Sequence, residues 1–180
     1  MRAILIAALA AMILGCANQA VVTPREYLDE QTGATITTVA EPWVFNRERT
    51  APQLDFINLY AIDVNRMGEH RQYLVLVQYW PAPEWKSAQP ILEIRAAADQ
   101  VRLRPLEASA RELGVGQPLD LSAPRAAKYW FYAVERAQLE RIARTQHSSV
   151  TLLKDDVRAS YIVWRDGSAE LNEFASFALD

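Results

Sequence analysis

Residues 56–80, FINLYAIDVNRMGEHRQYLVLVQYW, carry the strongest structural pattern of this 180-residue chain. β-Branched and aromatic residues dominate both ends of the segment, a composition that favours strands. Between them lie residues 65–70, where Gly68 can take a positive φ without steric cost. The segment therefore predicts an antiparallel hairpin. Residues 73–77 are apolar on both faces, so we expect a central strand that is covered on both sides.

Similar short runs recur along the chain, and turn-forming residues such as Pro42 and the pair 155–156 separate them. Along residues 100–106, valine and leucine alternate with arginine, which predicts one face toward the core and one toward solvent. Strands are expected at 35–40, 43–47, 56–64, 71–80, 89–95, 100–106, 129–135, 150–153 and 157–164.

Helical periodicity is confined to short segments. Residues 136–144 form an amphipathic pattern, and a last helix is expected after Ser168, which is a residue type that caps helices. Residues 106–113 are long enough for a helical turn or two that Gly114 would end. The pattern as a whole predicts a mainly β fold, an antiparallel β-sandwich or half-open barrel with two or three short helices. A single twisted sheet with helices against one face is the alternative.

The N-terminus has the three regions of an export signal. Arg2 supplies the charge, residues 3–14 are apolar, and the small residue Gly15 precedes Cys16. Twelve helical residues span roughly 18 Å, which is too short for the hydrocarbon core of a bilayer at about 30 Å. We therefore expect residues 1–15 to be a signal peptide and not a membrane span.

The tetrapeptide Ile13-Leu14-Gly15-Cys16 resembles the lipobox of bacterial prolipoproteins. This resemblance implies removal of residues 1–15, diacylglycerol on the Cys16 thiol and acylation of the new amino terminus. Because Ala17 is not the aspartate that favours retention in the inner membrane, it also implies the periplasmic side of the outer membrane. The alternative is an ordinary signal peptide in which Cys16, the only cysteine of the chain, is incidental.

The remaining chain divides into a tether and one domain. Residues 16–26 comprise the lipidated cysteine and a segment without apolar periodicity, and residues 27–180 have the size of a single β-rich domain. The formal net charge of the chain is −3, which argues against a nucleic-acid partner.

Three stretches give a second resemblance: residues 29–33, DEQTG; residues 39–42, VAEP; and residues 164–167, WRDG. Together they resemble a group of small proteobacterial outer-membrane lipoproteins. The resemblance implies a place in the cell envelope and lends no activity.

The sequence offers no arranged catalytic or metal-binding group. His70 and His147 belong to no paired-ligand spacing and are expected at the surface. The carboxylate pairs 29–30 and 155–156 are interpreted as solvated turns, and residues 114–116, GVG, as a simple loop. We therefore expect no catalytic residue, no metal and no cofactor.

Aromatic residues give the only other signal of a binding site. Residues 80–85, WPAPEW, place Trp80 and Trp85 on a proline-stiffened loop, and residues 129–132, YWFY, place rings on both faces of a strand. Core packing is the simpler interpretation. The functional interpretation makes Trp85 and Trp80 an interaction surface for an envelope protein or a glycan.

The leading functional expectation is thus a non-catalytic binding or assembly protein of the envelope, held to the lipid bilayer through acylated Cys16. A carrier of a small apolar ligand in a barrel-like pocket is the first alternative. A periplasmic hydrolase is the second.

Overall fold

A computed structural model describes residues 23–48, 55–79, 85, 89–96, 99–119, 121, 127–144 and 149–177. Cys16 and the signal segment lie outside these residues, and so do Trp80 and His147. The described strands are β1 (Arg25–Asp29), β2 (Ala34–Thr38), β3 (Trp43–Arg47), β4 (Phe56–Arg66), β5 (Glu69–Gln78), β6 (Ile91–Ala96), β7 (Asp99–Leu103), β8 (Lys128–Ala133), β9 (Ser149–Lys154) and β10 (Val157–Arg165). The described helices are α2 (Arg136–Ala143) and α3 (Ser168–Phe177).

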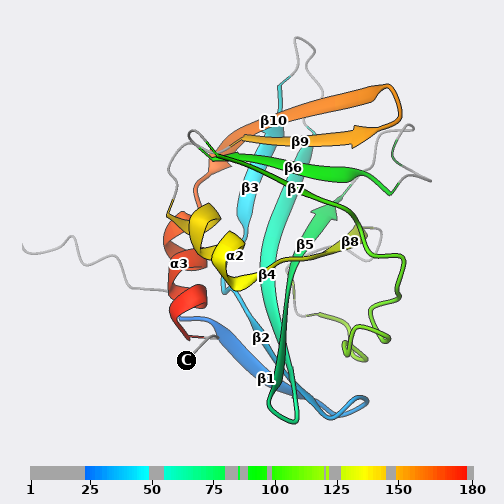
Figure 1. Ribbon diagram of the computed structural model, residues 1–180, viewed down its shortest axis with the longest axis vertical. Helices are drawn as coiled ribbons and strands as arrows, with labels where there is room; N and C mark the ends of the chain where they lie inside the picture. The colour runs from blue at the N-terminus through cyan, green and yellow to red at the C-terminus, as the bar shows by residue number, and fades with distance from the viewer. Residues whose placement is uncertain are drawn as a thin grey trace, which may run out of the picture.

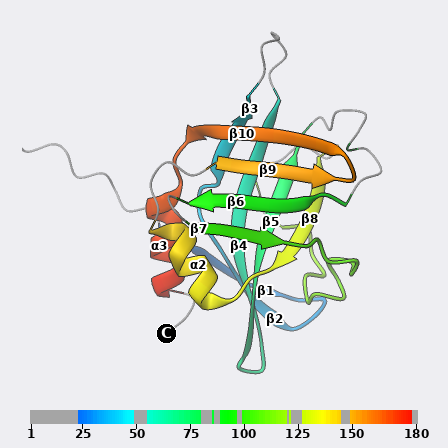
Figure 2. The same ribbon diagram turned by 45° about the horizontal axis from the view of Figure 1, so that its top comes forward.

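All strand pairs are antiparallel and belong to one sheet. The order β1-β2-β4-β3-β10-β9-β6-β7 forms its main path, while β5 joins β4 to β8. Figures 1 and 2 show β10, β9, β6 and β7 as one layer that runs across a second layer containing β3, β4, β5 and β8. The sheet folds over on itself without closing into a barrel. The expectation of a mainly β, antiparallel fold with few short helices is confirmed.

The two layers meet at the pairing of β3 with β10. Here the register slips between Val163 and Arg165, the irregularity of a β-bulge, which bends a strand and increases its twist. Directly beyond β10, Gly167 lies so close to the backbone of Trp43 that an added Cβ would sit 3.0 Å from it. The chain therefore passes tightly from the sheet into α3.

The core fills the space between the layers and both sides of β5. Residues 73–77 of β5 are all buried, and β5 pairs with β4 on one edge and β8 on the other. The expected central strand is confirmed. Residues 104–119 contribute to the same core: Leu106 donates its N–H to the carbonyl oxygen of Phe131 of β8, and Val115 is buried.

The turn between β4 and β5 is tighter than the six-residue connection expected from the sequence. Only Met67 and Gly68 lie outside the strands, with φ values of 55° and 86°. Two successive positive φ values are typical of a type I′ hairpin turn. The side chain of Asn65 accepts a hydrogen bond from the N–H of Gly68 at 2.9 Å. The expected positive φ at Gly68 is confirmed.

The helices pack against each other at one side of the sheet (Figure 1). In α2 the buried side chains are Leu139, Ile142 and Ala143, as the amphipathic pattern predicts. The cap of α3 differs from expectation: Ser168 is already its first residue, and its N–H is bound by the side chain of Asp166 at 2.9 Å. None of the described helices meets the length and apolarity that a membrane crossing requires.

Residues 106–113 do not form a helix. Bonds from Leu113 to Ser109 and from Val115 to Ala110 close a single helical turn, and Gly114 ends it with a φ of 94°. The single turn and the stop at Gly114 both agree with the expected helical turn or two.

The ordered domain begins earlier than the expected boundary at residue 27. Arg25 and Glu26 belong to β1 and pair with Thr38 and Thr37 of β2. Apolar periodicity does not reveal this strand, because its apolar residue Leu28 is 62 % exposed whereas its charged residue Asp29 is fully buried. The segment assigned to the tether must therefore end before Arg25.

Candidate functional site: the outer face of the β10 layer

The loop tryptophan that the sequence singled out lies in the core. The side chain of Trp85 is completely buried, so it does not project as a contact surface, and the expectation of an interaction site at this residue is wrong. The simpler interpretation, core packing, is the correct one for Trp85. Trp80 lies outside the described residues.

The aromatic run of β8 is also mostly core. Trp130, Phe131 and Tyr132 are buried, and the Tyr132 hydroxyl donates to the carbonyl oxygen of Pro90 at 2.8 Å. Burial raises the pKa of Tyr132 far above its ordinary value, so the hydroxyl remains protonated and acts as a structural donor. Tyr129, at 38 % exposed, is the most accessible ring of the four.

The one described histidine is partly exposed and oriented by a buried carboxylate. Nδ1 of His70 lies 2.8 Å from Oδ2 of Asp63, and Nε2 of Gln72 donates to the other oxygen at 2.8 Å. The His70 side chain is 43 % exposed, in agreement with the expected surface position. Among the described residues, no group of three histidine, cysteine, aspartate or glutamate side chains is placed to hold a metal ion.

Asp29 contradicts its interpretation as a solvated turn residue. Its carboxylate is fully buried and accepts four backbone N–H groups, from Gln31, Thr32, Gly116 and Gln117, at 2.7–3.1 Å. Burial alone would raise the pKa of this carboxyl, but the four hydrogen bonds outweigh it and hold the pKa below its ordinary value. The expected GVG loop thus has a structural role, since it binds Asp29.

The exposed chemistry gathers instead on the solvent side of the layer formed by β10, β9, β6 and β7, which we call the outer face (Figure 2). Alternate residues of each strand point outward, while their neighbours such as Leu92, Val150 and Tyr161 are buried between the layers. The outward residues used below are Glu93 and Arg95 of β6, Gln100 and Arg102 of β7 and the following Arg104, Ser149 and Thr151 of β9, and Arg158, Ser160, Ile162 and Trp164 of β10.

One half of the outer face is basic. Glu93 is only 4 % exposed, and its Oε1 lies 3.4 Å from Nη2 of Arg158 and 3.9 Å from Nη2 of Arg95. Both arginines remain more than half exposed. Arg102 and Arg104 are exposed and form no ion pair with another described residue. Among the outward residues given above, four arginines stand against one glutamate, and the exposed Glu48, whose N–H donates to the carbonyl oxygen of Ser160, borders them on the β3 side.

The other half of the outer face is apolar. Trp164 is 67 % exposed and Ile162 is 50 % exposed, both on β10. The ring of Trp164 packs edge-on against Phe56 of β4, with centroids 5.5 Å apart and an interplanar angle of 74°. This contact fixes the indole while leaving much of it open to solvent.

Strand register places the outward residues in rows. One row runs across four strands through Arg102, Glu93, Thr151 and Ser160. The next row crosses six strands and contains Gln100, Arg95, Ser149, Ile162, Asn46 and Phe56. The part of this row on the outer face, from Gln100 to Ile162, spans three strand spacings of about 4.8 Å, or about 14 Å, before the sheet folds over into β3 and β4.

Two hollows lie among the described residues, and neither has the depth and apolar lining that a carrier of an apolar ligand needs. An open hollow of about 380 Å³ between the β4–β5 turn and residues 112–114 is lined by charged side chains, including Arg66, Glu69, Arg71 and Glu112. A second hollow beside α3, between Trp43, Tyr60 and Leu171, measures about 10 Å³, which is room for one water molecule. Neither is the deep apolar pocket that the carrier alternative requires.

Comparison of this chain with protein-family models, with curated proteins and with solved structures finds no match.

Sequence reasoning overlooked the outer face for a physical reason. The end of β10, residues 161–164, is apolar at every position, so a period of two does not separate Tyr161 and Val163 from Ile162 and Trp164. One signal is usable: just before this stretch, the polar residues Arg158 and Ser160 alternate with Ala159. If the same alternation continues, the even-numbered residues 162 and 164 face solvent.

Proposed function

We propose that this chain is a lipid-anchored protein of the bacterial envelope, held at the outer membrane through acylated Cys16, that acts by binding rather than by catalysis. Its partner docks on the outer face. The lipobox-like tetrapeptide supports the anchor, and the exposed chemistry of β10 supports the binding role.

The observation that carries this proposal is the pairing of an exposed, fixed tryptophan with a basic surface. Large exposed apolar groups rimmed by polar residues mark interaction sites. Tryptophan and arginine are the residue types most enriched where binding energy concentrates. Trp164 and the four arginines of the outer face therefore provide both parts of a docking site.

The arrangement of the domain fits an outward-facing site. Nine residue steps separate Cys16 from Arg25, so the tether reaches at most about 30 Å. In Figure 1, β1 lies toward one end of the long axis and β10 toward the other. An anchor that enters at β1 therefore permits an orientation in which the outer face is directed away from the membrane and accessible to a partner in the periplasm.

The binding role is tested by crosslinking in cells. A photoreactive phenylalanine analogue replaces Ile162 on the outer face or, as a control, Phe177 of α3, which is exposed to a similar degree. We expect a specific crosslinked species from position 162 that disappears when Trp164→Ala is added. The proposal would be contradicted if the crosslink yields were equal at both positions, or if Trp164→Ala did not change the yield at position 162.

The anchor is tested separately by feeding cells a clickable palmitate analogue. Wild type should be labelled and Cys16→Ser should not, because the thiol and the new amino terminus are the only acylation sites that the resemblance implies. Equal labelling of the two proteins would remove the lipid anchor from the proposal.

A further inference from the structure

We propose that the ligand of the outer face is an anionic glycan, a polymer of sugar rings that carries carboxylates on its sugars or on short attached peptides. This inference rests on the proposed function, because it names the partner of the same face. Four features of the described residues lead to it: charge, polar rows, an aromatic platform and orientation.

The charge of the outer face is opposite to that of the chain. The chain carries a formal net charge of −3, yet the outward residues of this face include four arginines and one glutamate, with Glu48 at its β3 edge. A guanidinium group binds a carboxylate through two parallel hydrogen bonds. Glu93 contacts one nitrogen of Arg95 and one of Arg158, which leaves the other donors of both side chains for a ligand.

The polar rows match an extended polymer. Hydroxyl groups of Thr151 and Ser160, 3.5 Å apart, lie beside Glu93 in one row, and the amides of Gln100 and Asn46 belong to the next. Such side chains donate to and accept from sugar hydroxyls in either direction. A row of about 14 Å across four strands offers contacts to consecutive sugar units, whereas a compact ligand would use only part of it.

Trp164 supplies the aromatic platform. Its ring is held on edge against Phe56, and 67 % of the residue remains exposed. The face of an aromatic ring is negatively polarised and attracts positively polarised C–H groups, which line one side of a sugar ring. Because Phe56 already fixes the indole, stacking of a sugar would lose little side-chain entropy.

Orientation and composition favour a glycan over a lipid surface. The outer face lies at the end of the molecule away from β1, so the tether allows it to point away from the bilayer that would hold Cys16 (Figure 1). Its strongly exposed apolar residues are Ile162 and Trp164, the half-buried Ile91 and Leu153 share its register, and the remaining outward residues are polar or charged. A protein partner is the outcome that the test must separate from a glycan.

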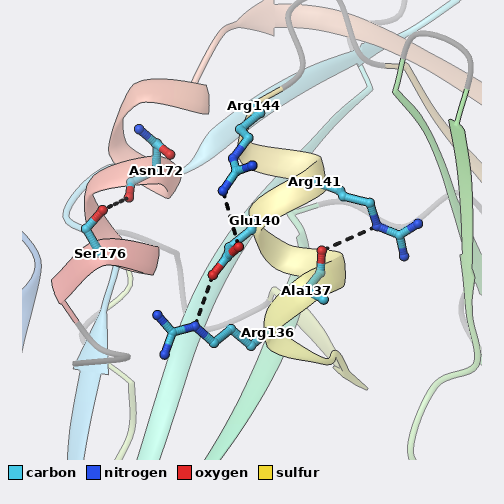
Figure 3. A network of polar contacts seen from close by, with 7 residues as sticks. All are labelled: Arg136, Ala137, Glu140, Arg141, Arg144, Asn172 and Ser176. Carbon is cyan, nitrogen blue, oxygen red and sulfur yellow. Dashed lines mark hydrogen bonds and ion pairs between the residues drawn. The ribbon is translucent and has the colours of Figure 1, made fainter.

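Helix α2 provides a matched control for the arginines. There Arg136 and Arg144 bracket Glu140, at 3.0 and 3.3 Å, in the same two-to-one ratio as the arginines around Glu93 (Figure 3). These side chains lie on an exposed helix surface that does not contribute to the outer face. Substitutions on α2 therefore change net charge without touching the proposed site.

The test uses the full-length lipoprotein in detergent and two glycan probes. Purified peptidoglycan sacculi carry carboxylates on stem peptides, and immobilised alginate carries them on its sugars. We expect binding to at least one probe and loss of binding when the carboxylates of that probe are converted to amides. Arg102→Gln with Arg104→Gln should weaken it about tenfold, equivalent to about 1.4 kcal/mol, and Trp164→Ala should do the same.

The control proteins are Arg136→Gln with Arg144→Gln, which removes two positive charges from α2, and Phe177→Ala, which removes an exposed ring from α3. Both should bind as wild type. The glycan assignment would be overturned if neither probe were bound, or if the control variants weakened binding as much as the outer-face variants do. If a protein crosslink at position 162 persists in that case, the proposed binding function stands; if it is also missing, both proposals fail.

Discussion

At the scale of single residues, Asp29 is the most informative side chain of the described structure. Its carboxylate joins β1 to the loop of Gly116 and Gln117, which lie 87 and 88 residues further along the chain. Thr32 strengthens the same junction through a 2.8 Å hydrogen bond to the carbonyl oxygen of Gly114. A single buried charge therefore attaches the loop of residues 114–117 to the edge strand β1.

This geometry predicts a pH-dependent contribution to stability. Asp29→Asn keeps the size of the side chain but leaves one oxygen for four N–H donors, so we expect a loss of about 2–3 kcal/mol near pH 7. The folded-state pKa of Asp29 is lowered. Its contribution is therefore full above the unfolded value of about 3.9 and is lost as the pH falls through the folded value.

Urea unfolding of wild type and Asp29→Asn across a pH series from about 7 down to about 3 measures this contribution. The difference in unfolding free energy should shrink toward the acid end. Glu30→Gln, at the adjacent exposed carboxylate, is the control and should stay within about 0.5 kcal/mol of wild type. A difference between wild type and Asp29→Asn that is constant with pH would contradict the role assigned to the charge.

Two tryptophans give opposite predictions. Trp85→Ala should lower the free energy of unfolding by about 3–5 kcal/mol, because a fully buried indole is removed. Trp164→Ala should cost no more than about 1 kcal/mol, since Trp164 is two-thirds exposed and loses mainly its contact with Phe56. Thermal and urea unfolding of both variants measure the contrast, and a larger loss for Trp164→Ala would reverse the assignment of core and surface.

At the scale of elements, one turn residue lowers the stability of the β4–β5 hairpin. Met67 takes a φ of 55° and is completely exposed, so it contributes strain and no packing. A left-handed conformation is costly for residues other than glycine, although asparagine adopts it readily. The Met67-Gly68 turn is therefore less favourable than the Asn-Gly pair that type I′ turns prefer.

Met67→Asn should accordingly stabilise the protein by about 0.5–1 kcal/mol, because the turn conformation is retained at a lower cost. Met67→Ala is the matched control, since it removes the same exposed side chain but keeps the unfavourable φ. The midpoints of urea unfolding should rank Met67→Asn above both wild type and Met67→Ala. Equal midpoints for Met67→Asn and Met67→Ala would show that this turn does not limit stability.

At the scale of the whole molecule, one sheet supplies both layers and the helices close one side. The bulge near Val163 lets β10 pair with β3 on one edge and β9 on the other while the layers cross. The same fold-over turns alternate residues of β10 either into the core or onto the outer face. The architecture thereby creates the candidate site.

The domain should fold without a metal ion, because its apolar core spans both layers and the described residues contain no cluster of metal-binding side chains. Far-ultraviolet circular dichroism should show a strand-dominated spectrum, and excess chelator should leave the midpoint of thermal unfolding unchanged. A fall of several degrees on adding chelator would contradict this prediction.

The sequence alone determined the local units of this protein. The hairpins β4–β5, β6–β7 and β9–β10, the burial of residues 73–77 and the amphipathic α2 all follow from side-chain periodicity and turn residues. These signals act over a few residues, so they are readable before the chain folds. The inward positions of Val101 and Leu103 are confirmed for the same reason.

Only the tertiary structure decided which side chains are covered. Asp29 is buried because a loop nearly ninety residues away covers it, Trp85 is buried in the core, and Trp164 is exposed because β10 folds over as an outer layer. Composition predicts the opposite for Asp29 and Trp164 and leaves both interpretations open for Trp85. Burial is a property of the packing between distant segments, and the strand pattern of one sequence does not specify which segments will meet.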